Sequence, residues 1–300
     1  MPRIIVLESL GLSVGLCGPD ATVGAVVATL DIGRRLVPGV VVIPDHRTLV
    51  GQINFEWADS WSMICRGTSV RLRGPLELLT AENLWYSVIS AVFATVGARI
   101  GRFLLHVSTV RIGEGAVAVA GVGKSSTAYL LARSHSATVL GDDTAYLVPC
   151  HPRSHLIADS APPTLRVPAD LLSEDGHCDR HPVSAGARGE VTFDAADSPA
   201  SGVPLLGIAV VGPSFAAPRV DDLGGVDRMS ALYGLLNERL LNERRFVSGL
   251  AEPVPILLAA RDRRRIGAAD AALDGVPVVR FFGSPKEIAH EVSLWAGHLR

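Results

Sequence analysis

The sequence predicts an α/β protein with a core sheet flanked by helices, preceded by a strand-rich α+β region. From about residue 100, apolar runs typical of strands alternate with segments of helical character. A glycine-rich segment at 118–125 joins one of these strands to a helix. Residues 1–75 are instead rich in Val and Ile and interrupted by Gly and Pro, a pattern typical of short strands joined by turns.

The composition allows a sizeable core. The chain has 300 residues, of which 48% are hydrophobic and 19% charged, so one large domain or two small ones are expected. The net charge of −2 provides no positive field for a nucleic acid. The four cysteines form no CxxC pair, which argues against a zinc site or a disulfide framework.

Targeting signals and membrane spans are not expected. The first residues lack a basic stretch followed by a long apolar run, so we expect no signal peptide. The most apolar stretch, 84–96, is shorter than the roughly 20 residues that a membrane-spanning helix needs. We therefore expect a cytoplasmic protein that does not bind membranes.

Two regions are expected along the chain. Residues 1–100 form an accessory region that ends in a helix, which begins at Thr80 and continues through apolar residues to Ile100. Residues 101–300 form the domain that holds the glycine-rich segment. The expected strands are at 41–46, 52–57, 69–74, 103–110, 115–121, 137–148, 205–212 and 276–282. The expected later helices are at 125–133, at 227–250 and after a capping box at 284–287, and 150–202 is expected to be rich in loops.

The segment 118–125, AVAGVGKS, fits the phosphate-binding loop (P-loop) pattern, with Ala118 where the first glycine usually stands. Gly121 and Gly123 permit backbone angles and a close approach that side chains would block. Successive N–H groups and the following helix N-terminus can then point at phosphate oxygens. The predicted nucleotide-binding residues are Ala118, Gly121, Val122, Gly123, Lys124, Ser125 and Ser126.

Lys124 is one of only two lysines in a chain that otherwise uses arginine. Its compact charge suits the β- and γ-phosphates better than the planar arginine fork does. Ser125 can offer its hydroxyl to Mg²⁺. The alternative interpretation is a glycine-rich turn with an incidental lysine.

Two further features carry candidate chemistry. Asp142 and Asp143 follow a predicted strand, and one could bind Mg²⁺ while the other accepts a proton from an attacking hydroxyl. Neighbouring strand residues face opposite ways, so both can serve only if the strand bends at Gly141. An exposed turn is the alternative.

His106 lies on an apolar strand, where a histidine is either a satisfied core residue or a contact near the site.

These features together resemble a known family. The segment HVSTVRIGEGAVAVAGVGKSSTAYLLARSHSATVLGDDTAYLV is similar to the catalytic core of the HPr serine kinase/phosphorylase family and its shorter homologues. The resemblance implies an HPr kinase-like P-loop domain that uses ATP and Mg²⁺. It implies that Gly121 to Ser125 hold the phosphates and magnesium. It also implies that Asp142 is the catalytic base, that Asp143 lies near the metal and that His106 contacts the phosphates.

Departures from the family pattern bear on the substrate. Members that phosphorylate HPr have glutamate after the Lys-Ser pair, where this chain has Ser126, and the chain has no Glu-Ile-Arg-Gly-type segment downstream. HPr is therefore not the expected substrate. Shorter homologues occur among enzymes that make or tailor peptides and other secondary metabolites, which points to a hydroxyl on a small molecule, an amino acid or a peptide. Related kinases form oligomers, so a homo-oligomer stays open.

The sequence thus predicts a kinase that transfers the γ-phosphoryl group of ATP to a hydroxyl. Lys124, Asp142, Asp143 and His106 are the predicted catalytic residues, and Ser125 and Asp143 the metal ligands. One alternative is a nucleotide-binding regulatory protein without transfer activity. Another is a phosphorylase or phosphatase that uses the same site. Residues 1–100 and 150–202 are the expected places of acceptor specificity, because variable loops on a rigid scaffold usually carry it.

Overall fold

The protein is described from a computed structural model. The described residues are 3–43, 48–78, 80–158, 164–174, 188–193, 202–214, 217–241 and 263–299. The chain forms two compact units, each assembled from separate segments. Unit 1 comprises Met1–His106, Tyr146–Val148 and Leu232–Ala272, and unit 2 comprises Val107–Ala145, Pro149–Ala231 and Leu273–Arg300.

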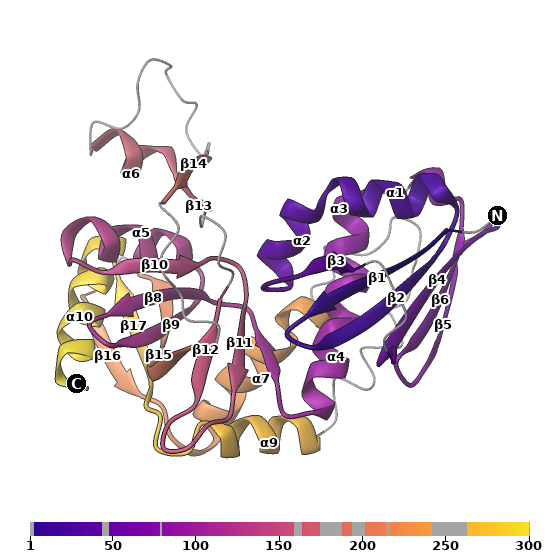
Figure 1. The fold of residues 1–300 in the computed structure, drawn as a ribbon. Coiled ribbons are helices and arrows are strands. Elements are labelled where there is room, and N and C mark those ends of the chain that lie inside the picture. The colour runs from indigo at the N-terminus through magenta and orange to yellow at the C-terminus, as the bar shows by residue number, and fades with distance from the viewer. Residues whose placement is uncertain are drawn as a thin grey trace. The chain divides into compact units, whose positions relative to one another are not determined.

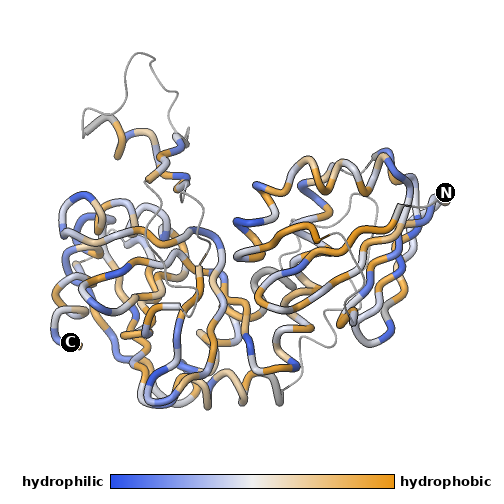
Figure 2. The backbone as a smooth tube through the Cα atoms, viewed as in Figure 1, coloured by the Kyte–Doolittle hydropathy of each residue, from blue (hydrophilic) through white to orange (hydrophobic). Residues whose placement is uncertain are grey.

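Unit 1 is built on a sheet in the order β3-β1-β2-β4-β6-β5 (Figure 1). Antiparallel and parallel pairings both occur, since β1 pairs with β2 in antiparallel fashion and β4 lies parallel to both β2 and β6. Hydrophobic residues run along β1 and β2 (Figure 2). The strands of this sheet are β1 (Arg3–Ser9), β2 (Leu12–Gly18), β3 (Val41–Ile43), β4 (Gly51–Trp57), β5 (Ser62–Arg66) and β6 (Ser69–Gly74). The chain segments of this unit also hold β7 (Phe103–Leu105) and most of β11 (Ala145–Val148), which are not part of this sheet.

Helices supply the rest of the core of unit 1. Trp85 is fully buried, and its indole N–H donates to the carbonyl of Val26 at 3.3 Å. Gly33 packs against the Trp85 ring so closely that a Cβ there would lie 2.5 Å from it. The helices are α1 (Asp20–Ala28), α2 (Leu30–Leu36), η1 (Leu76–Leu78), α3 (Ala81–Leu84), η2 (Trp85–Ile89), α4 (Ser90–Arg99) and α9 (Arg263–Ala272).

Several expectations for the N-terminal region are confirmed. Strands occupy 52–57 and 69–74, and the strand expected at 41–46 spans Val41–Ile43, while 44–46 lie outside the described residues. The expected helix begins after Thr80, whose hydroxyl accepts a hydrogen bond from the Asn83 N–H at 3.1 Å. Helices α1 and α2 were not predicted.

The sheet of unit 2 has β9 and β15 at its centre, and these two strands are parallel. Strands β8 and β10 extend it in antiparallel fashion beyond β9, and β17 lies parallel to β15 on the other side. Strand β12 pairs with the start of β15, and β16 pairs with β17. The bounds are β8 (Ser108–Ile112), β9 (Gly115–Gly121), β10 (Thr138–Gly141), β12 (His155–Ile157), β15 (Val203–Pro213), β16 (Arg219–Asp222) and β17 (Val278–Gly283).

Helices α5 (Lys124–Ser134) and α10 (Pro285–His298) contribute to the core of unit 2. Val119 of β9 belongs to the same buried cluster as Tyr129 of α5 and Val292 of α10. The remaining elements of this unit are β13 (Thr164–Pro168), α6 (Ala169–Glu174), β14 (Arg188–Thr192) and the first part of α7 (Gly225–Leu241), whose residues from Leu232 on belong to unit 1.

The two long strands expected at 103–110 and 137–148 are wrong in extent. The first is interrupted at residues 106–107, which separates β7 from β8. The second breaks at residues 142–144, where Asp143 has a φ of 69° that no extended strand can accommodate. The chain is therefore a mixed α/β protein in which each of these two apolar runs forms two short strands.

Most of the other strands and helices expected in this half are confirmed, but the segment 150–202, expected to be rich in loops, holds β12, β13, α6 and β14 in its described residues. Strands occupy most of 115–121, 205–212 and 276–282, and Ser284 forms a capping box with Glu287 at the start of α10. Helix α7 covers the first part of the expected 227–250 helix, and the part after Leu241 lies outside the described residues. Among the described helices, none combines the length and the hydrophobicity that crossing a membrane requires.

Candidate functional site

The glycine-rich segment forms a tight turn between β9 and α5. Strand β9 ends at Gly121, Val122 and Gly123 form the turn, and α5 begins at Lys124. Gly121 and Gly123 both have a φ of 91°, a region that side chains other than glycine rarely adopt. A Cβ on Gly121 would also lie 2.3 Å from the carbonyl oxygen of Val211 on the neighbouring strand. Glycine at 121 is therefore required by both the backbone angle and the close approach of β15.

The helix start is open at this turn. The Gly123 carbonyl accepts from the Thr127 N–H at 2.9 Å, which is the first bond of α5. The N–H groups of the first helical turn have no intrahelical acceptor, and they give the helix start a positive partial charge. Val122 at the tip of the turn is 72% exposed. The turn therefore offers N–H donors at a solvent-accessible position.

Of the seven predicted nucleotide-binding residues, 121–123 lie at the turn, 124 and 125 begin α5, and the other two are buried on either side of the turn. Ser126 is buried in the first turn of α5. Ala118 lies inside β9, where it is fully buried and pairs with Thr109 and Ile208. The strand thus continues three residues beyond the position where the P-loop pattern places its first glycine.

The break after β10 carries two carboxylates toward the turn. The pairing of β10 with β8 shifts register between Val139 and Gly141, so the end of the strand bends. The positive φ of Asp143 and a hydrogen bond from the Thr144 N–H to the Asp142 carbonyl, 2.9 Å long, close the bend. The expected bend at Gly141 is therefore present.

Four predicted site residues, Lys124, Ser125, Asp142 and Asp143, meet at this point and form the Lys124 cluster. The Lys124 ammonium lies 3.3 Å from Asp143 Oδ1 and 3.7 Å from Asp142 Oδ1. The Ser125 hydroxyl lies 3.1 Å from both carboxylate oxygens of Asp142. The Lys124 and Asp142 side chains are 11% and 4% exposed, so this pair is held in a largely desolvated environment. Such a pair persists only when further hydrogen bonds satisfy its remaining polar atoms.

Sequence reasoning missed one member of the cluster. Ser108, fully buried on β8, donates its hydroxyl hydrogen to Asp142 Oδ1. It is paired with Val119, two residues before Gly121, so it lies at the end of the sheet that carries the turn. Nothing in the local sequence marks this serine, because the contact depends on the register of β8 with β9 and β10.

His106 belongs to a different unit from this cluster. It is the last residue of the first segment of unit 1, whereas Lys124, Asp142 and Asp143 belong to unit 2. Its side chain is buried, and its backbone N–H donates to the carbonyl of Leu235 at 3.2 Å. Its predicted contact with phosphates stays a prediction.

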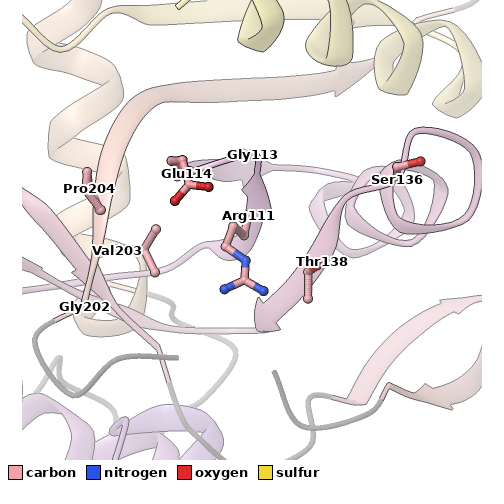
Figure 3. Close-up of a pocket in the computed structure, with 8 residues that line it drawn as sticks. All are labelled: Arg111, Gly113, Glu114, Ser136, Thr138, Gly202, Val203 and Pro204. Carbon is pink, nitrogen blue, oxygen red and sulfur yellow. The ribbon is translucent and has the colours of Figure 1, made fainter. Parts of the chain in front are cut away.

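A separate cavity lies at the opposite end of β9 (Figure 3). It has a volume of about 720 Å³ and is lined by Arg111 and Glu114 around the β8–β9 turn, with Thr138 of β10 and Pro204 of β15. Because β9 begins at this cavity and ends at the glycine turn, the cavity is not part of the Lys124 cluster.

No protein-family model matches this chain, and comparison with curated proteins also gives no match. The geometry of the Lys124 cluster is therefore what points to a function.

Proposed function

We propose that the protein is an ATP- and Mg²⁺-dependent kinase whose core is a P-loop domain of the HPr kinase type. One observation carries the proposal. Lys124 and Ser125 begin a helix directly after a turn with two glycines of positive φ. The Lys124 ammonium and the Ser125 hydroxyl lie within bonding distance of the carboxylates of Asp143 and Asp142, which follow the next strand. A site for phosphoryl transfer needs these groups: a cation and N–H donors for phosphates, oxygen ligands for a metal and a carboxylate for the acceptor.

The phosphates are proposed to bind at the turn between β9 and α5. Their oxygens would accept from the N–H groups at the start of α5, and Lys124 would turn from the two carboxylates toward the β- and γ-phosphates. The exposure of the turn gives a bulky triphosphate access to these donors.

The donor set around Lys124 fits magnesium. The hydroxyl of Ser125 and the carboxylates of Asp142 and Asp143 are hard oxygen ligands, and Mg²⁺ is usually held by one or two carboxylates together with substrate phosphates. Ser125 and Asp143 would hold the ion. When bound, it would neutralise negative charge on the transferring phosphoryl group.

Asp142 is proposed to act on the acceptor. Its carboxylate would orient the acceptor hydroxyl and take its proton as the acceptor oxygen bonds to the γ-phosphorus. The bond from the γ-phosphorus to the bridging oxygen breaks, and ADP leaves. The acceptor class follows the resemblance to shorter homologues: a small molecule, an amino acid or a peptide of secondary metabolism.

One observation favours the alternative of nucleotide binding without transfer. Because β9 continues through Gly121, only two residues separate the strand from the helix, so fewer loop N–H groups surround a phosphate than the full P-loop pattern provides. Such a site could recognise a nucleotide and pass the signal to a partner protein.

Two variants test the proposal. Lys124→Ala should abolish transfer of the γ-phosphoryl group from labelled ATP in a screen of hydroxyl-bearing metabolites and peptides. Asp142→Asn should retain Mg·ATP binding in calorimetry while transfer falls sharply. A wild-type protein that binds neither ATP nor GTP with magnesium would refute both interpretations. Binding without transfer to any acceptor would favour the regulatory alternative.

A further inference from the structure

The buried hydroxyl of Ser108 contacts the carboxylate that the proposed function places at the acceptor. The hydroxyl donates to Asp142 Oδ1. Ser108 lies on β8, which does not contribute residues to the glycine-rich turn. Ser108 is fully buried, and its backbone is fixed by antiparallel pairing with Val119 of β9. The donor is therefore held rigidly in position.

The other polar contacts of the Asp142 side chain come from two groups that, in the proposed function, turn toward the metal and the phosphates. Ser125 donates to both carboxylate oxygens of Asp142, and Lys124 lies 3.7 Å from Oδ1. If Ser125 turns to a metal and Lys124 to phosphates, both leave Asp142. Ser108 is then the remaining hydroxyl on Oδ1, while Oδ2 becomes accessible.

We propose that Ser108 is a positioning residue that holds Asp142 Oδ1 and thereby directs Oδ2 toward the acceptor hydroxyl; the inference rests on the proposed kinase function. A carboxylate fixed at one oxygen retains its orientation when its other partners depart. This matters because catalytic groups act only within a narrow range of distances and angles.

Thr109 provides a matched control. It follows Ser108 on β8, is equally buried and points to the opposite face of the sheet, because side chains alternate along a strand. Its hydroxyl has no hydrogen-bond partner within the described part of the chain. Thr109→Val therefore removes a buried hydroxyl from the same strand without removing a hydrogen bond of Asp142.

The test compares Ser108→Ala, Thr109→Val, Asp142→Asn and the Ser108→Ala/Asp142→Asn double variant. Calorimetry measures Mg·ATP affinity, and ADP release from Mg·ATP, with water as acceptor, measures turnover. Ser108→Ala should lower kcat by about 10- to 100-fold, with KM and affinity unchanged. Thr109→Val should match the wild type. In the Asp142→Asn background, Ser108→Ala should cause no further loss of kcat, because Ser108 is proposed to act only through the Asp142 carboxylate.

The results distinguish a failure of the kinase proposal from a failure of the positioning role of Ser108. If the wild type releases no ADP and transfers to no acceptor, the kinase proposal is refuted and this inference with it. If the wild type turns over and Ser108→Ala matches it, only the positioning role is refuted. A further loss from Ser108→Ala in the Asp142→Asn background, or an equal loss from Thr109→Val, would show a general packing effect and overturn the proposal.

Discussion

Replacing the two glycines of the β9–α5 turn by alanine should have unequal effects on stability. Both residues have a φ of 91°, and placing an L-side chain in this left-handed region costs about 1–2 kcal/mol. At Gly123 the new methyl group would meet no atom within 4 Å, so Gly123→Ala should lower the free energy of unfolding by that amount alone.

Gly121→Ala carries a second cost. Its Cβ would lie 2.3 Å from the Val211 carbonyl oxygen, and this atom belongs to the backbone of a central strand that cannot move aside freely. Overpacking of this kind adds about 1–3 kcal/mol, so the total loss should reach about 2–5 kcal/mol.

Urea unfolding followed by circular dichroism measures both losses in the full chain, with the slope of each transition as a check that the unfolded state is unchanged. Equal losses of stability in the two variants, or a larger loss in Gly123→Ala, would show that the contact with the Val211 carbonyl adds no cost. The comparison does not depend on any bound nucleotide.

Three further predictions concern other parts of the fold. Gly33→Ala should destabilise the protein by about 1–3 kcal/mol in urea unfolding, because its Cβ would lie 2.5 Å from the Trp85 ring. Ser284→Ala should cost about 0.5–2 kcal/mol in the same assay, since the cap of α10 is lost. The pKa of His135 is lowered by burial and then by His290, so the folded state binds this proton less readily than the unfolded state. Stability should therefore fall as pH drops through about 6.5, and thermal melts of His135→Asn should show a weaker pH dependence.

The sequence predicts the turn well because its requirements are local. Glycines at 121 and 123 and the helix after them follow from backbone angles and helix-start chemistry, which neighbouring residues determine. The carboxylate pair was also predictable, as was the need for the strand to bend before both side chains could serve.

Other parts of the site depend on register and could not be predicted. Ser108 reaches Asp142 only because β8 pairs with β9 and β10 in a particular alignment, and no pattern within one strand encodes that alignment. The apolar run at 103–110 likewise predicts one strand, since hydrophobicity alone does not reveal the interruption at 106–107. The position of Ala118 is different: it matches the loop pattern, yet it lies within the strand that the sequence predicts at 115–121, and β9 confirms that strand.

The interleaving of the two units limits how the molecule can be dissected. Unit 1 takes its residues from three stretches of chain, so a truncation after His106 would remove β11 and α9 from it. No single cut yields either unit whole. To express either unit alone, the separate segments would have to be joined in one rearranged gene. After a single proteolytic cut, the two fragments should still need each other to complete each unit.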